Sequence, residues 1–127
     1  MDRDRLVALL RPEITTIDVT ILTSEAEKFQ SQVLRPIIKF QHDLLILVFD
    51  SHLKRKQVKL ASFSEEKQVA LVEEIFINDR LFINELKGVV VALFTSDEYL
   101  KYNLSLSEIN KRLIQIIKTR ILSTILK

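Results

Sequence analysis

The chain has 127 residues, 47% of them hydrophobic, and a formal net charge of +2. That length suits one ordinary domain, and the apolar fraction is too high for a disordered chain. One glycine, two prolines and no cysteine argue against an all-β fold and exclude disulfides, thiol catalysis and cysteine-based metal sites. The mild charge does not by itself indicate a nucleic-acid-binding protein.

Residues 1–23 are predicted to form a short helix followed by an extended arm. The first part places Leu6, Leu9 and Leu10 on one side of a helix that Pro12 would end. The following ITTIDVTIL is rich in β-branched residues, which favour extended backbone. The sequence holds no apolar run of the length that a signal peptide or a membrane span needs, so we expect a cytoplasmic protein that does not enter the membrane.

Residues 24–127 are predicted to form a single helical domain around one long helix over residues 29–53. Ser24 suits its N-cap, and apolar side chains recur at helical spacing over about half of its circumference. Pro36 lacks a backbone N–H and should kink or divide this helix. Gln41 falls inside the apolar arc, where a buried amide needs a partner. It is interpreted as a core glutamine bonded to its neighbours, with a ligand contact as the alternative.

The connector after this helix holds the densest group of positive side chains: Lys54, Arg55, Lys56 and Lys59. Cations near a helix C-terminus complement the helix dipole, which gives a purely structural explanation. The functional alternative is contact with phosphate or nucleic acid. If the last helix packs beside the connector, three further cations would extend this basic patch: Lys111, Arg112 and Lys118.

A second long helix, of about thirty residues, is predicted to start after Ser64 and to continue through Gly88, because the apolar phase is preserved across that glycine. Residues 89–94 are β-prone and could instead form a buried strand, although the sequence offers no convincing partner strand. The helical interpretation is therefore preferred.

Two capping boxes are predicted in the last third of the chain. Thr95 with Glu98 would begin a short helix, and Ser105 with Glu108 would begin the last one. The predicted fold is an all-α bundle of four to five helices, two of them long, with an extended N-terminal arm.

Two charged side chains fall on apolar helix faces, Asp79 in the second long helix and Arg120 in the last helix. Because a lone buried charge is costly, we expect these two groups to meet, with Gln41 joining them. Such a polar cluster would either fix the helix register or form a small pocket for an anionic or amide ligand.

Several short motifs carry a family resemblance: FQ…LRPIIK.Q.DLL within residues 29–45, LKG at 86–88, FT..EY at 94–99 and NKR at 110–112. Together they resemble a group of small uncharacterised bacterial proteins, some of which carry the label glyoxalase. That label implies a metal-dependent, β-rich fold of the vicinal-oxygen-chelate type. His42 and His52 would lie about 15 Å apart on one helix, too far for a shared ion, so no catalytic or metal-binding residue is carried over.

These patterns predict a non-enzymatic protein-interaction or assembly module without a cofactor. A homodimer is expected, because the broad apolar arcs exceed what one small bundle covers. The first alternative is nucleic-acid or phosphate binding through the basic connector at 54–59. The second is a small-ligand pocket or enzyme at Gln41, Asp79 and Arg120.

Overall fold

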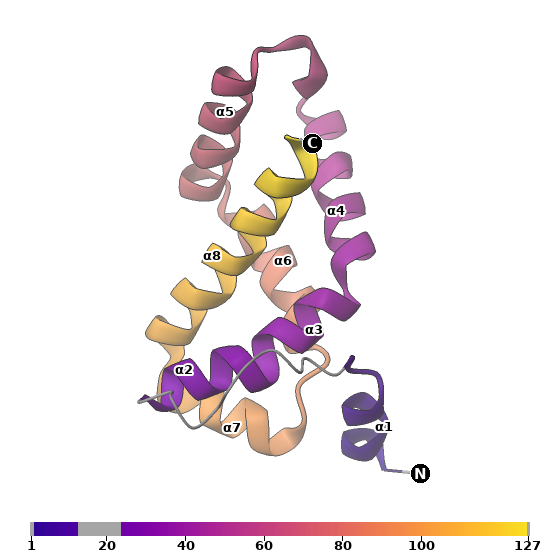
Figure 1. The fold of residues 1–127 in the computed structure, drawn as a ribbon, viewed down its shortest axis with the longest axis vertical. Coiled ribbons are helices and arrows are strands. Elements are labelled where there is room, and N and C mark those ends of the chain that lie inside the picture. Colours follow the sequence, from indigo (N-terminus) through magenta and orange to yellow (C-terminus); the bar gives the residue numbers. More distant parts are fainter. Residues whose placement is uncertain (1, 13–23, 127) are drawn as a thin grey trace.

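The computed structural model describes residues 2–12 and 24–126, and the regular elements within these ranges are helices (Figure 1). In chain order they are α1 (Arg3–Leu9), α2 (Glu25–Phe29), the π-helix η2 (Gln30–Leu34), α3 (Arg35–Phe40), α4 (His42–Arg55), the 3₁₀-helix η3 (Leu60–Ser62), α5 (Glu65–Asn78), α6 (Arg80–Val91), α7 (Ser96–Leu104) and α8 (Leu106–Ile125). The predicted all-α bundle is confirmed, but the described chain is divided into more helices than the four to five expected. The predicted extended arm lies outside the described residues.

Helix α8 is a central element, against which five helical segments pack. In Figure 1 it runs diagonally across the front of the molecule, between α4 and α5. It contacts α2, η2, α5, α6 and α7. The side of α8 that faces the core carries buried residues four positions apart, which fall on one side of a helix: Ile109, Leu113, Ile117 and Ile121.

In the part of the chain that the structure describes, no helix is both long enough and apolar enough to cross a membrane.

Aromatic side chains tie several of these helices together in the core. Phe29 of α2 packs edge-on against Phe94, with 5.5 Å between the ring centroids. Phe49 of α4 lies 6.2 Å from Phe82 of α6, again measured between centroids. Each fully buried side chain of this kind contributes about 1.5–3 kcal/mol relative to an exposed one. These contacts hold α2, α4 and α6 in place and so fix the surface on which α8 lies.

The predicted long helix over residues 29–53 is divided into η2, α3 and α4, with α2 preceding them. Ser24 is the N-cap as predicted, and its hydroxyl accepts a hydrogen bond from the backbone N–H three residues later at 3.0 Å. Pro36 follows the π-helical turn, so the predicted disturbance takes the form of a widened turn just before the proline. A further break falls at Gln41, where φ is −90° and ψ is 7°.

The prediction of one helix running from Ser64 through Gly88 is wrong. The chain leaves the helical conformation at Asp79, with φ −93° and ψ 76°, and this single residue separates α5 from α6. The apolar pattern continues across the break, so the pattern alone did not reveal it. Residues 89–94 complete α6 and then form a turn, so the alternative of a buried strand is also wrong.

Of the two predicted capping boxes, one forms. The Thr95 hydroxyl accepts from the Glu98 N–H, and the Glu98 carboxylate accepts from the Thr95 N–H at 2.8 Å. At the start of α8, however, Ser105 has φ −136° and ψ 45°, and its side chain makes no capping bond. The predicted box with Glu108 is therefore wrong, and Glu108 pairs instead with Arg112 one turn further along the helix.

Polar side chains attach α1 to the rest of the molecule. Arg3 donates to carbonyls that follow the end of α6, and Asp4 accepts from the first N–H of α7 at 3.0 Å. Arg11 donates with both terminal nitrogens to the Glu98 carboxylate. The apolar side chains predicted to share one side of this helix are exposed: Leu6, Leu9 and Leu10.

Candidate functional site

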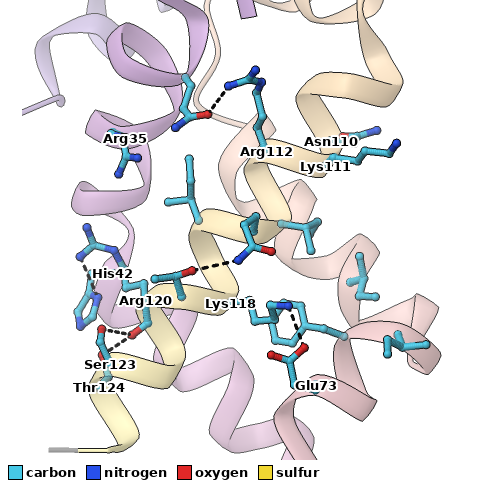
Figure 2. Close-up of a pocket in the computed structure, with 18 residues that line it drawn as sticks. Arg35, His42, Glu73, Asn110, Lys111, Arg112, Lys118, Arg120, Ser123 and Thr124 are labelled. Atoms are coloured by element: carbon cyan, nitrogen blue, oxygen red, sulfur yellow. Dashed lines mark hydrogen bonds and ion pairs between the residues drawn. The ribbon is translucent and has the colours of Figure 1, made fainter. Parts of the chain in front are cut away.

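An open groove of about 1230 Å³ runs along α8, and side chains from η2, α3, α4, α5 and α6 also line it (Figure 2). It is lined by five cationic side chains: Arg35, Lys111, Arg112, Lys118 and Arg120. Glu73 is the only carboxylate among the described residues that line it. The groove is therefore strongly positive, in a chain whose net charge is only +2.

The sequence of α8 creates this surface through its helical period. Arg112, Ile116 and Arg120 recur every fourth position and form a row beside the buried face. Arg112 and Arg120 are two turns apart, about 12 Å along the helix axis. Figure 2 shows Arg120 pointing to one side of α8, toward His42, and Lys118 pointing to the other side.

One side of the groove, here called the arginine flank, consists of Arg35, Arg112 and Arg120. Arg112 donates to the Gln30 side-chain oxygen at 2.8 Å and pairs with Glu108 at 3.2 Å. Its Nε is buried, with no hydrogen-bond partner among the described residues. The helix that carries Gln30 thus holds Arg112 at one end of the groove.

At the other end of the arginine flank, Arg120 Nη1 lies 3.3 Å from His42 Nδ1. A guanidinium only donates hydrogen bonds, so this contact requires an unprotonated Nδ1 on His42. Neither Arg35 nor Arg120 forms an ion pair with any side chain that the structure describes. Two guanidinium groups on this flank therefore have no carboxylate partner.

The opposite side, here called the lysine flank, consists of Lys111, Lys118 and Glu73. Lys118 Nζ lies 2.9 Å from the Glu73 carboxylate, which neutralises the only acid in the lining. Apolar side chains from three helices also line the groove: Phe76, Ile77, Ile83 and Ile114. The groove therefore combines a positive rim with an apolar surface.

The hypothesis that Gln41, Asp79 and Arg120 form one polar cluster is wrong. Gln41 donates to the Val89 carbonyl at 3.1 Å, in agreement with the interpretation of a glutamine bonded to the backbone. Asp79 bonds to side chains of α4, and Arg120 contacts His42. The three residues are separated because the helix breaks at positions 41 and 79 redirect two of them.

Asp79 accepts hydrogen bonds from Lys56 Nζ at 2.8 Å and from His52 Nε2 at 2.7 Å. These bonds, first that from Lys56 and then that from His52, lower the pKa of the Asp79 carboxyl. The His52 ring also stacks on Phe82, with 4.3 Å between centroids and 12° between planes. The cluster therefore joins the end of α4 to the break between α5 and α6, which is a structural role.

The basic connector is partly neutralised by its surroundings. Lys56 pairs with Asp79, and Arg55 lies 3.7 Å from Glu85. Lys54 and Lys59 are exposed and have no ion pair with the described part of the chain. The three cations that were expected to extend this patch line the groove along α8 instead.

Sequence reasoning missed the groove as a site and did not select Arg35. The every-fourth-residue spacing of Arg112, Ile116 and Arg120 was a usable sign of a polar row on the last helix. The place of Arg35 opposite that row depends on how α8 lies against α3, which no sequence pattern shows. Within residues 2–12 and 24–126, no three His, Asp or Glu side chains gather as a metal site would require.

Comparisons of the chain with protein families, with curated proteins and with solved structures give no match.

Proposed function

We propose that the protein is a non-enzymatic interaction module that binds an acidic, partly apolar segment of another protein in the groove along α8. The observation that supports this most strongly is the lining itself. It holds five cations and one carboxylate. Lys118 is paired with that carboxylate and Arg112 with Glu108. The remaining three cations have no ion pair with the described residues: Arg35, Lys111 and Arg120. A bound segment with acidic side chains would supply the missing negative charge.

The size and form of the groove favour a peptide segment over a small molecule. Small-molecule pockets usually measure about 300–1000 Å³ and enclose most of the ligand. This groove is larger, at about 1230 Å³, and it is open. Its apolar side chains also suit the apolar face of an amphipathic helix, which is a recurrent mode of peptide recognition.

The same lining is less suited to nucleic acid. Single-stranded nucleic acid binds to exposed aromatic side chains on which bases stack. The described lining holds no Tyr or Trp, its one Phe, Phe76, is buried, and the His42 ring lies against Arg120. The basic connector, the earlier candidate for nucleic acid, has two of its cations paired with carboxylates.

Charge reversal in the groove tests this proposal. The probe is a fluorescein-labelled amphipathic helical peptide of leucine and glutamate, and its affinity is measured by fluorescence anisotropy. Lys111→Glu is expected to weaken binding about fivefold, because one favourable contact at a solvated rim contributes about 1 kcal/mol. Added salt should weaken binding of the unaltered protein.

The matched control is Lys54→Glu in the basic connector. Lys54 and Lys111 are both exposed helical lysines, and the described residues offer neither of them an ion pair. Only Lys111 lines the groove, so Lys54→Glu should leave the affinity nearly unchanged. A larger loss with Lys54→Glu would contradict the groove as the binding site and favour the connector.

Self-association is a second candidate, supported by one exposed apolar stripe. Phe40, Leu44 and Leu47 follow helical spacing along α3 and α4, and each remains exposed, Leu47 by 62%. A second copy of this chain packing on the stripe would remove it from water. Sedimentation should then give a dimer that Leu47→Glu dissociates, whereas a monomer at high protein concentration would contradict this candidate.

A further inference from the structure

We infer that the arginine flank binds a phosphate group carried by the acidic segment, between Arg35 and Arg120 and beside His42. This inference rests on the proposed function, because it assigns a chemical group to one part of the same groove. It goes beyond that function by predicting that phosphorylation of the partner strengthens binding.

The first argument is the separation of the two kinds of cation. The arginine flank presents guanidinium groups, and the ammonium groups lie on the lysine flank (Figure 2). A guanidinium is planar and donates two parallel hydrogen bonds, which matches the oxygens of a phosphate or a carboxylate. An ammonium acts as a point charge without that fork. The arginine flank is therefore the side that can recognise the shape of an anion.

The second argument is the lack of negative partners. No ion pair with Arg35 or Arg120 is found in the described ranges of the chain. Among the described residues, the Arg120 guanidinium has one polar side-chain contact, to the His42 ring, at a distance of 3.3 Å that is long for a hydrogen bond. Its guanidinium can therefore turn to an anion without breaking an ion pair.

The third argument is the amount of charge. Arg35 and Arg120 together carry two positive charges, and one carboxylate would neutralise half of them. A phosphoserine carries about −1.5 to −2 charges at neutral pH and three acceptor oxygens. Its charge can therefore balance both guanidinium groups, and its three oxygens leave an acceptor for the imidazole. Arg112 is held by Gln30 and Glu108 and forms the end of the flank.

The test compares two peptides that differ at one position. The first is the leucine–glutamate helical peptide, and the second carries phosphoserine in place of one glutamate. The phosphorylated peptide should bind roughly tenfold more tightly to the unaltered protein. Arg35→Gln and Arg120→Gln should each remove most of that preference. Arg35→Lys should retain only part of it, because lysine keeps the charge but lacks the two parallel donors of a guanidinium.

The control is Lys111→Gln, which removes one positive charge from the opposite flank. It should weaken both peptides alike and keep the preference for phosphoserine. Circular dichroism of each variant checks that its helical content is unchanged. A phosphoserine preference that is absent, or that survives both arginine substitutions, would overturn the inference while binding of the glutamate peptide still supports the proposed function. Failure of both peptides to bind would refute the proposed function as well.

Two competitors distinguish other sources of phosphate. Inorganic phosphate alone should compete much more weakly than the phosphorylated peptide, because it lacks the contacts of the segment. Equal competition by inorganic phosphate would assign the flank to a free ion. Stronger competition by a single-stranded oligonucleotide at the same salt concentration would assign it to a phosphodiester backbone. Either of these results would overturn the inference.

Discussion

The ion pair between Arg11 and Glu98 joins the segment that follows α1 to α7. Both terminal nitrogens of Arg11 donate to the carboxylate, and one of them also donates to the Leu93 carbonyl at 2.9 Å. The side chains are only 13% and 17% exposed. Burial alone would raise the pKa of Glu98, but the hydrogen bonds from Arg11 and Thr95 outweigh it, and the pKa is lowered.

The substitution Glu98→Gln isolates this pair. Glutamine can still accept from the Thr95 N–H, so the capping box is retained and the charge of the pair is lost. A hydrogen bond to a charged group contributes about 1.5–3 kcal/mol, and the remaining exposure places this pair near the lower end. We expect a loss of about 2 kcal/mol in the free energy of unfolding, or roughly 6–12 °C in Tm.

The pH dependence gives an independent check. A carboxyl whose pKa is lowered on folding adds stability above its unfolded pKa and loses it as the pH falls through its folded pKa. The folded pKa of Glu98 lies below its usual value of 4.5. The difference in the free energy of unfolding between the unaltered protein and Glu98→Gln should therefore be largest at neutral pH and should vanish in acid below pH 4.5.

Thermal unfolding followed by circular dichroism measures these effects, and Glu108→Gln is the matched control. Glu108 also pairs with an arginine, Arg112, but its side chain is 57% exposed. An exposed pair of this kind contributes about 0.2–1 kcal/mol, so the control should change Tm little. Equal shifts for the two substitutions, or a Glu98→Gln effect that persists unchanged in acid, would refute the reasoning from burial and pairing.

Two further predictions concern the break at Asp79 and the interior of α6. Asp79→Asn should lower the free energy of unfolding by about 1–2 kcal/mol in urea at neutral pH, because the charged bonds with Lys56 and His52 are weakened. Since the Asp79 pKa is lowered, this effect should fade as the pH falls below 3.8, and the exposed Asp50→Asn serves as control. Gly88→Ala should stabilise the protein by about 0.5–1 kcal/mol in the same assay, because a Cβ there meets no atom within 4 Å in the interior of α6. A destabilising effect would show that this glycine is needed for something other than the helix.

The sequence predicted the features that depend on neighbouring residues. Ser24, Ser64 and Thr95 are N-caps as expected, because a cap is formed with N–H groups only a few positions away. The breaks at Gln41 and Asp79 were missed, since one non-helical residue leaves the apolar period almost unchanged. The polar partners of Gln41 and Asp79 were missed as well, because each break turns the side chain toward another element.

The sequence also did not predict the contacts between elements that are far apart in the chain. The leucines of α1 share one side of a helix, which ordinarily predicts that this side is buried. In the structure, Val7 is the buried residue of α1, and Arg3 and Asp4 bond to carbonyls and an N–H group where α6 ends and α7 begins. The burial of Val7 together with these hydrogen bonds orients α1 and leaves its leucines exposed.

The charge distribution links the fold to the proposed function. The whole chain has 19 Lys and Arg against 17 Asp and Glu, so a groove lined by five cations and one carboxylate leaves carboxylates in excess elsewhere. A positive groove on an otherwise slightly acidic protein attracts anionic partners to one place and repels them from the rest of the surface. The association rate of an acidic peptide should therefore fall steeply with ionic strength, and most of that dependence should disappear when the groove cations are neutralised. If neutralising the connector cations instead removed the dependence on ionic strength, the connector and not the groove would be the surface that attracts the peptide.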